Sequence, residues 1–162
     1  MRRRHVKVAF WALAALLLAS AGWLGFEANG AYAANTRDAD VHSVQQVAGQ
    51  EVVSLYSLGY KNFDTQWQVV LRGLTGSFKK QVVSGGSQAR SEVVNGKVIS
   101  SATLSGTGVT TIGGKSATVI VVVDRVGQSS TVKTPAEQVV RVQVSLSKVG
   151  GRWLVSNIGA VS

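Results

Sequence analysis

An uncharged apolar run near the N-terminus, residues 8–26, constrains this chain more than any other feature. The run is nineteen residues long and follows a basic segment, residues 1–7, that holds four Lys or Arg. A helix of this length measures about 28 Å, close to the roughly 30 Å hydrocarbon core of a bilayer. The run therefore predicts a transmembrane helix. Residues 1–7 are then a cytoplasmic tail, because basic flanks are retained on that side of the membrane.

A cleaved secretory signal is the alternative to an anchor. Ala31-Tyr32-Ala33 has the small-x-small form of a cleavage site. The apolar run is longer than the about 7 to 15 residues of a signal h-region, and Trp11 and Trp23 lie near its ends as interfacial anchors do. The sequence favours the uncleaved anchor and leaves cleavage open. Both alternatives export the rest of the chain, so we expect a single-pass cell-membrane protein with an extracytoplasmic C-terminal domain.

Composition narrows what the exported part can do. Residues 27–36 form a tether, and residues 37–162 are long enough for one domain with its own core. The exported residues carry 13 Lys and Arg against 8 Asp and Glu, scattered without interleaved aromatic residues, which argues against nucleic-acid binding. The chain has no cysteine, and His42 is the sole exported histidine. We therefore expect no disulfide, no metal site and no cofactor.

Helical periodicity dominates the first part of the exported domain. One helix is expected at about residues 37–58, ended by Gly59, because apolar residues recur every three or four positions. Its apolar face comprises Val41, Val44, Ala48, Val52 and Leu55. Asp64 is placed to cap a second helix at about residues 65–74 by accepting a hydrogen bond from a free backbone N–H.

The helical region continues less regularly as far as Gly96. We expect a break or kink at Thr75-Gly76, helix again at residues 78–83, and a flexible segment at residues 84–87. A third helix is predicted at about residues 88–95, with Gly96 as its C-cap. Asn95-Gly96 is also a hairpin-turn signal, which is the alternative at this point.

Beyond Gly96 the apolar period changes from helical to two, and β-branched residues dominate. Strands are expected at about residues 97–109, 117–126, 138–149 and 152–160. The third alternates most clearly, with Val140, Val142, Val144 and Leu146 facing a core. Short connections require antiparallel pairing, and Gly106 and Gly108 indicate a bulge or bend. The predicted class is α+β: a transmembrane helix, then two or three helices packed on a curved four-stranded antiparallel sheet.

This order of elements resembles the cone of nuclear transport factor two-like domains. Together with the N-terminal anchor, the chain is similar to the Mce-associated membrane protein family of actinobacterial envelopes. The stretches that carry the resemblance are SLGYKNFD at residues 57–64, LTGSF at 74–78 and KVGGRWLV at 148–155.

The resemblance implies a non-enzymatic accessory protein that supports the assembly or stability of an Mce-type lipid or sterol transport complex. Its implied partners are the membrane and the Mce and permease proteins. Homo-oligomerisation, for example through the sheet, stays open. An anchored cone-domain subunit of a secretion or conjugation apparatus is the alternative within the same binding class, because it has the same layout.

An exported lipid-binding or isomerase-like enzyme is the alternative from another class. Tyr56, Tyr60 and Asp64 lie close in sequence and could form a tyrosine and acid pair in a pocket. The predicted strands hold Asp124 as their one carboxylate, at a strand end, so we expect no catalytic residues and assign Asp64 to capping. Pocket or interaction candidates are the aromatic residues Tyr56, Tyr60, Trp67, Phe78 and Trp153.

Overall fold

The computed structural model describes residues 38–161. The predicted cytoplasmic tail, transmembrane helix at residues 8–26 and tether at residues 27–36 lie outside this range. Within it, no helix combines the length and apolar character needed to cross a membrane. The compact domain considered below begins at Val41.

The long helix at residues 38–56 packs on the sheet through the apolar face that its sequence predicts. Val44, Ala48 and Val52 are fully buried on that face. The helix ends earlier than Gly59, because the following backbone turns to pair with the start of the first strand. Gly59 forms an antiparallel bridge with Ile99, and the Tyr60 N–H donates to the Val98 carbonyl at 2.9 Å.

The second helical region is two helices with a complete break between them. Helix α2 is Phe63–Gly73 and helix α3 is Gly76–Ser84. Leu74 has an extended backbone and forms a parallel bridge with Val155, while the Thr75 N–H donates to the Val155 carbonyl at 2.8 Å. The predicted break or kink at Thr75-Gly76 is therefore a break, in which Leu74 and Thr75 leave the helix and pair with the last strand.

The predicted flexible segment at residues 84–87 is instead a joint between two helices. Helix α4 is Gly86–Asn95, so Gly85 alone separates it from α3. Gly96 caps the end of α4 as predicted, and its N–H donates to the Glu92 carbonyl at 3.0 Å. The expectation of two or three helices is wrong, because the described chain contains four.

The sheet is a four-stranded antiparallel meander in the order β1-β2-β3-β4. Its strands are β1 Ile99–Ile112, β2 Ser116–Gln128, β3 Ala136–Val149 and β4 Arg152–Ala160. Register shifts between Leu104 and Gly106 and between Val109 and Thr111 confirm the predicted bulge region. Gly150 and Gly151 join β3 to β4 with φ values of 56° and 80°, a left-handed turn that suits glycine.

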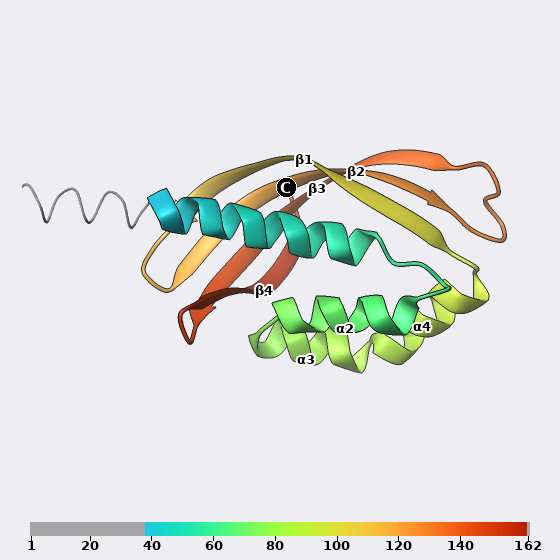
Figure 1. Cartoon of the computed structure of the whole chain (residues 1–162), viewed down its shortest axis with the longest axis horizontal. Helices are drawn as coiled ribbons and strands as arrows, with labels where there is room; N and C mark the ends of the chain where they lie inside the picture. Colours follow the sequence, from blue (N-terminus) through green and yellow to red (C-terminus); the bar gives the residue numbers. More distant parts are fainter. Residues whose placement is uncertain (1–37, 162) are drawn as a thin grey trace, which may run out of the picture. The chain divides into compact units, whose positions relative to one another are not determined.

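One face of the sheet carries the core. Val-rich strands share a buried cluster with the long helix and with Val70 of α2, and α3 contacts β4. Figure 1 shows α2, α3 and α4 grouped together beside the long helix. The buried apolar cluster comprises Val44, Ala48, Val52, Val70, Leu74, Ala117, Val119, Val121, Val123, Val142, Val144, Leu146, Trp153 and Val155. Alternate residues of β2 and β3 supply much of it, because successive side chains of a strand point to opposite faces.

Both edge strands are bonded to parts of the chain that are not strands. On β4, Val155 pairs with Leu74 as described above. On β1, Ile99 bridges to Gly59, and the Ala102 N–H donates to the Ser57 hydroxyl at 3.0 Å. The segments that follow the long helix and α2 therefore satisfy backbone groups that an open sheet edge exposes.

The alternation in β3 predicts a matched pair of stability effects. Val144 has no exposed surface, whereas Val139 on the same strand is 51% exposed. We expect Val144→Ala to lower the free energy of unfolding by about 2 kcal/mol, because it removes buried methyl groups and leaves a cavity. Val139→Ala should stay within about 0.5 kcal/mol of the parent chain. Equal losses in urea denaturation would contradict the observed register.

Candidate functional site

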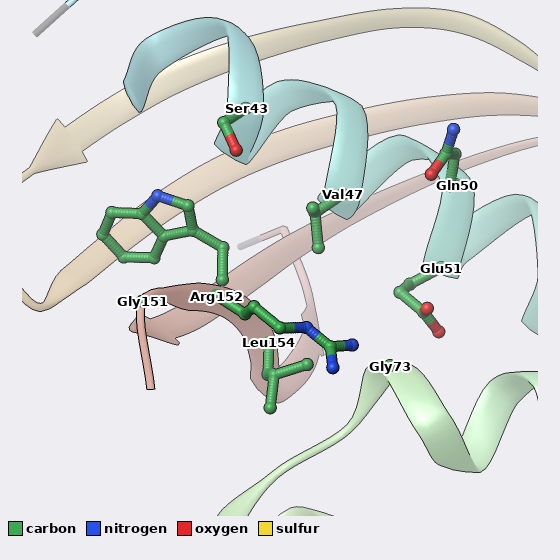
Figure 2. Close-up of a pocket in the computed structure, with 9 residues that line it drawn as sticks. Ser43, Val47, Gln50, Glu51, Gly73, Gly151, Arg152 and Leu154 are labelled. Atoms are coloured by element: carbon green, nitrogen blue, oxygen red, sulfur yellow. The ribbon is translucent and has the colours of Figure 1, made fainter. Parts of the chain in front are cut away.

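A cavity of about 380 Å³ lies where the long helix, the end of α2 and the start of β4 meet (Figure 2). The helix contributes one wall, Gly73 a second, and the β3–β4 turn with the first residues of β4 the third. The lining residues are Ser43, Val47, Gln50, Glu51, Gly73, Gly151, Arg152, Trp153 and Leu154.

Glu51 is the chemically unusual residue of this cavity. Its Oε2 atom is buried and has no hydrogen-bond partner. Burial raises the pKa of Glu51 from the ordinary value of 4.5 to about 7, because a desolvated carboxylate loses the water that stabilises its charge. The group therefore changes charge close to neutral pH.

Gly73 makes room for this carboxylate. A Cβ atom built on Gly73 would overlap Oε1, Cδ and Oε2 of Glu51. Gly73 is the last residue of α2, immediately before the excursion of Leu74 and Thr75. The break between the helices thus brings a bare backbone against an acidic side chain of another helix.

Arg152 supplies the second charge. Figure 2 shows its guanidinium group directed toward the space between Glu51 and Gly73. The side chain is exposed, and no hydrogen bond joins it to Oε2 of Glu51. Val47 and Leu154 add apolar surface, while Ser43 and Gln50 add polar groups. The cavity thus combines apolar walls with one carboxylate and one guanidinium group.

The five aromatic candidates have different surroundings. Trp153 lines the cavity, is buried, and has the Lys148 ammonium 5.1 Å from its ring centre. Tyr56 and Phe78 are half-buried and pack against the core. Trp67 stacks on Phe63 with ring centres 5.2 Å apart. Tyr60 lies in the loop after the long helix, with the Lys61 ammonium 5.9 Å from its ring centre. Trp153 is thus the candidate that this cavity contains.

The capping role predicted for Asp64 is wrong. Helix α2 begins one residue earlier, Asn62 occupies the N-cap position, and no side chain forms a cap hydrogen bond there. Asp64 instead accepts hydrogen bonds from Arg90 of α4 at 2.9 and 3.2 Å. The bond from Arg90 lowers the pKa of Asp64, which is exposed. Asp64 therefore links α2 to α4 at the surface and is not a pocket acid beside Tyr56 and Tyr60.

Sequence reasoning missed Glu51, Gly73 and Arg152. One signal was available for Glu51: it lies four residues after Val47 and seven after Val44, which places it beside the apolar face of the helix. An acid at such a position is often solvated at the edge of the face. The approach of Gly73 and Arg152 depends on the tertiary fold, and local sequence gives no sign of it.

Solved structures share this fold along nearly their whole length. The periplasmic domain of DotI is 17% identical with a TM-score of 0.59, covering 73% of this chain and 94% of that one. An IcmL-like type IV secretion system protein from Legionella pneumophila is 13% identical with a TM-score of 0.58, covering 73% and 89%. CagV, a VirB8 homologue from Helicobacter pylori, is 12% identical with a TM-score of 0.53, covering 75% and 99%. At these identities the likeness establishes the fold alone.

The class that emerges is an α+β domain with the nuclear transport factor two-like fold, as the sequence resemblance predicted. Residues 6–162 match the family described as "Uncharacterized protein Rv1363c/MT1408-like", and the chain belongs to that family. A search of curated proteins found no match. None of these comparisons refers to Mce proteins or lipid transport, so the Mce association stays a prediction.

The raised pKa of Glu51 predicts a pH-dependent effect of Glu51→Gln. Between pH 4.5 and about 7 the folded chain binds more protons than the unfolded chain, so ionisation of Glu51 lowers stability as the pH rises. Gln remains neutral. Relative to the parent chain, we expect the free energy of unfolding of the variant to rise by about 1 to 2 kcal/mol between pH 4 and pH 8. This value is smaller than the full pKa shift would give, because the Glu51 side chain is only half-buried.

Urea denaturation at both pH values measures this difference. The control is Glu92→Gln, which removes an exposed carboxylate on α4 that accepts a hydrogen bond from Gln88. A Glu51→Gln effect that is the same at pH 4 and pH 8 would show that Glu51 titrates normally.

The close approach of Gly73 to Glu51 predicts the outcome of Gly73→Ala. The added methyl group occupies the position of the carboxylate, which must rotate toward water. We expect the pKa of Glu51 to fall from about 7 toward its ordinary value. Stability at pH 7 should change little, because the displaced charge regains water and Ala favours the helix by up to about 1 kcal/mol.

A pH titration of the glutamate carboxyl carbons by NMR follows this change. Gly159→Ala is the matched control, because a methyl group there meets open space. An unchanged Glu51 titration in Gly73→Ala would mean that Gly73 does not control the position of the carboxylate.

Proposed function

We propose that this chain is a membrane-anchored binding protein whose extracytoplasmic domain serves as a subunit of a secretion-type membrane assembly. The observation that carries the proposal is the fold match, which covers 94% of the DotI periplasmic domain and 99% of CagV. Two of the matched proteins are described as type IV secretion system components. The proposal transfers that role by fold, which is an argument from analogy.

Two separate observations support the extracytoplasmic location. The DotI domain is described as periplasmic. In this chain, the uncharged run at residues 8–26 behind four basic residues favours export of everything after it. An anchor also raises the effective concentration of the domain toward other membrane proteins, so that weak contacts suffice for assembly.

The proposal assigns no catalytic role to the domain. The cavity described above offers one carboxylate and one guanidinium, and the acid of the isomerase alternative, Asp64, is held at the surface by Arg90. Among residues 38–161, no group of three or more His, Cys, Asp or Glu side chains is arranged to hold a metal ion. Binding is the role that these side chains support best.

An Mce accessory protein is the narrower alternative. It rests on the resemblance at residues 57–64, 74–78 and 148–155, and it shares the anchor and the fold with the main proposal. The two differ in the partner proteins alone, so partner identity separates them.

Co-purification from the native host tests the proposal. The tagged full chain is cross-linked in cells, extracted in mild detergent and analysed by mass spectrometry. We expect enrichment of membrane proteins that form a secretion-type channel, or of an associated ATPase. Recovery of Mce and permease subunits would favour the alternative, and recovery of the chain alone would overturn both.

A control variant tests whether the domain, and not the membrane segment, binds the partner proteins. In this variant an unrelated membrane helix of equal length replaces residues 8–26. The same partners should be recovered, because the proposal places the binding surface in the domain beyond the anchor.

A further inference from the structure

We infer that the Glu51 cavity is a receptor for a basic side chain, Lys or Arg, presented by a partner protein. This inference rests on the proposed binding function and names the chemistry of one contact. The cavity is defined by Glu51, Gly73, Arg152, Val47 and Leu154, with the remaining lining residues given above.

The carboxylate is the reason for expecting a cation. A buried polar atom without a partner is uncommon and costly in folded proteins, and Oε2 of Glu51 is such an atom. An ammonium or guanidinium group would supply both the missing hydrogen bond and the opposite charge. Gly73 allows the carboxylate to occupy this position, because a Cβ atom there would overlap it.

The size and the walls of the cavity suit a single long side chain. About 380 Å³ is near the lower end of the range for ligand pockets, about 300 to 1,000 Å³. Val47 and Leu154 offer apolar surface to the methylene stem of Lys or Arg, while the charged tip reaches Glu51. A basic side chain therefore matches both the apolar walls and the carboxylate of the cavity.

The positive charge of Arg152 repels a cationic ligand, and this repulsion can be tested by substitution. It is the other charged residue of the lining, and its guanidinium points into the same space (Figure 2). Because the side chain is exposed, it can move into water when a ligand enters. Removing its charge should therefore strengthen the binding of a cation and weaken the binding of an anion.

Proton linkage gives a second signature. Burial raises the pKa of Glu51 to about 7, and a cation binds the ionised form. Binding should therefore release a proton. The affinity should fall by up to about tenfold for each pH unit below 7 and level off above it.

The experiment uses the full chain in detergent micelles with its glutamate carboxyl carbons labelled for NMR. The chain has four glutamates, and the Glu51 signal is the one that Glu51→Gln removes. The probes are n-butylammonium and n-butylguanidinium, with n-butanol and butyrate as neutral and anionic controls. We expect saturable shifts of the Glu51 signal with the two cations, at lower concentration in Arg152→Gln, and unchanged affinity in Glu92→Gln.

Three results would overturn the inference. Absence of a cation-dependent shift at Glu51 would exclude the site, and equal binding of butanol would show an apolar cavity without charge selection. Butyrate binding that Arg152→Gln abolishes would reassign the cavity to an anion. Arg152→Gln and the pH series use an intact Glu51, so the test does not depend on the folding of Glu51→Gln.

The outcomes also separate this inference from the proposed function. If Glu51→Gln still recovers the partners found with the parent chain, and the cations do not bind, the inference fails while the binding function stands. If the parent chain recovers no partner, the binding function fails whatever the cavity titration shows.

Discussion

The backbone contact between Leu74, Thr75 and Val155 organises the helical half of this domain. Leu74 and Thr75 leave the helix and pair with Val155 of β4. This pairing separates α2 from α3 and connects both helices to the sheet. The same excursion fixes the end of α2 at Gly73, beside Glu51 of the long helix. A single main-chain pairing thus determines the helix boundaries, one sheet edge and a wall of the cavity.

The Glu51 cavity contains a group that core packing disfavours, namely a carboxylate with a buried oxygen. In the core, valine and leucine side chains such as Val144 and Leu146 are removed from water, and the gain in stability follows from this apolar burial. Glu51 is drawn partly into the same environment and keeps a buried oxygen without a partner. Departures of this kind from local consistency are expected where a protein binds something, because the missing interaction is supplied by the ligand.

Local patterns predicted the elements that depend on one periodicity. The alternation of Val142, Val144 and Leu146 placed these residues in the core, and the spacing of Val44, Ala48 and Val52 identified the buried helix face. The sequence predicts a break or kink at Thr75-Gly76. It does not predict the pairing of Leu74 with Val155, because Val155 lies far along the chain. The capping role predicted for Asp64 is wrong for the same reason, because its partner, Arg90, belongs to another helix. Long-range contacts were therefore not predictable from the sequence, including the proximity of Glu51, Gly73 and Arg152 in one cavity.

The bonding of both edge strands to the chain itself limits how this sheet can be extended. An incoming strand would have to displace Leu74 from β4, or Ser57 and Gly59 from β1, before it could bond along the full edge. Displacement at β4 would also release the joint between α2 and α3. Growth of the sheet by strand addition, whether in assembly or in aggregation, is thus coupled to partial unfolding of the helices. In the folded chain these parts of the two edges are occupied by its own backbone and by the Ser57 hydroxyl.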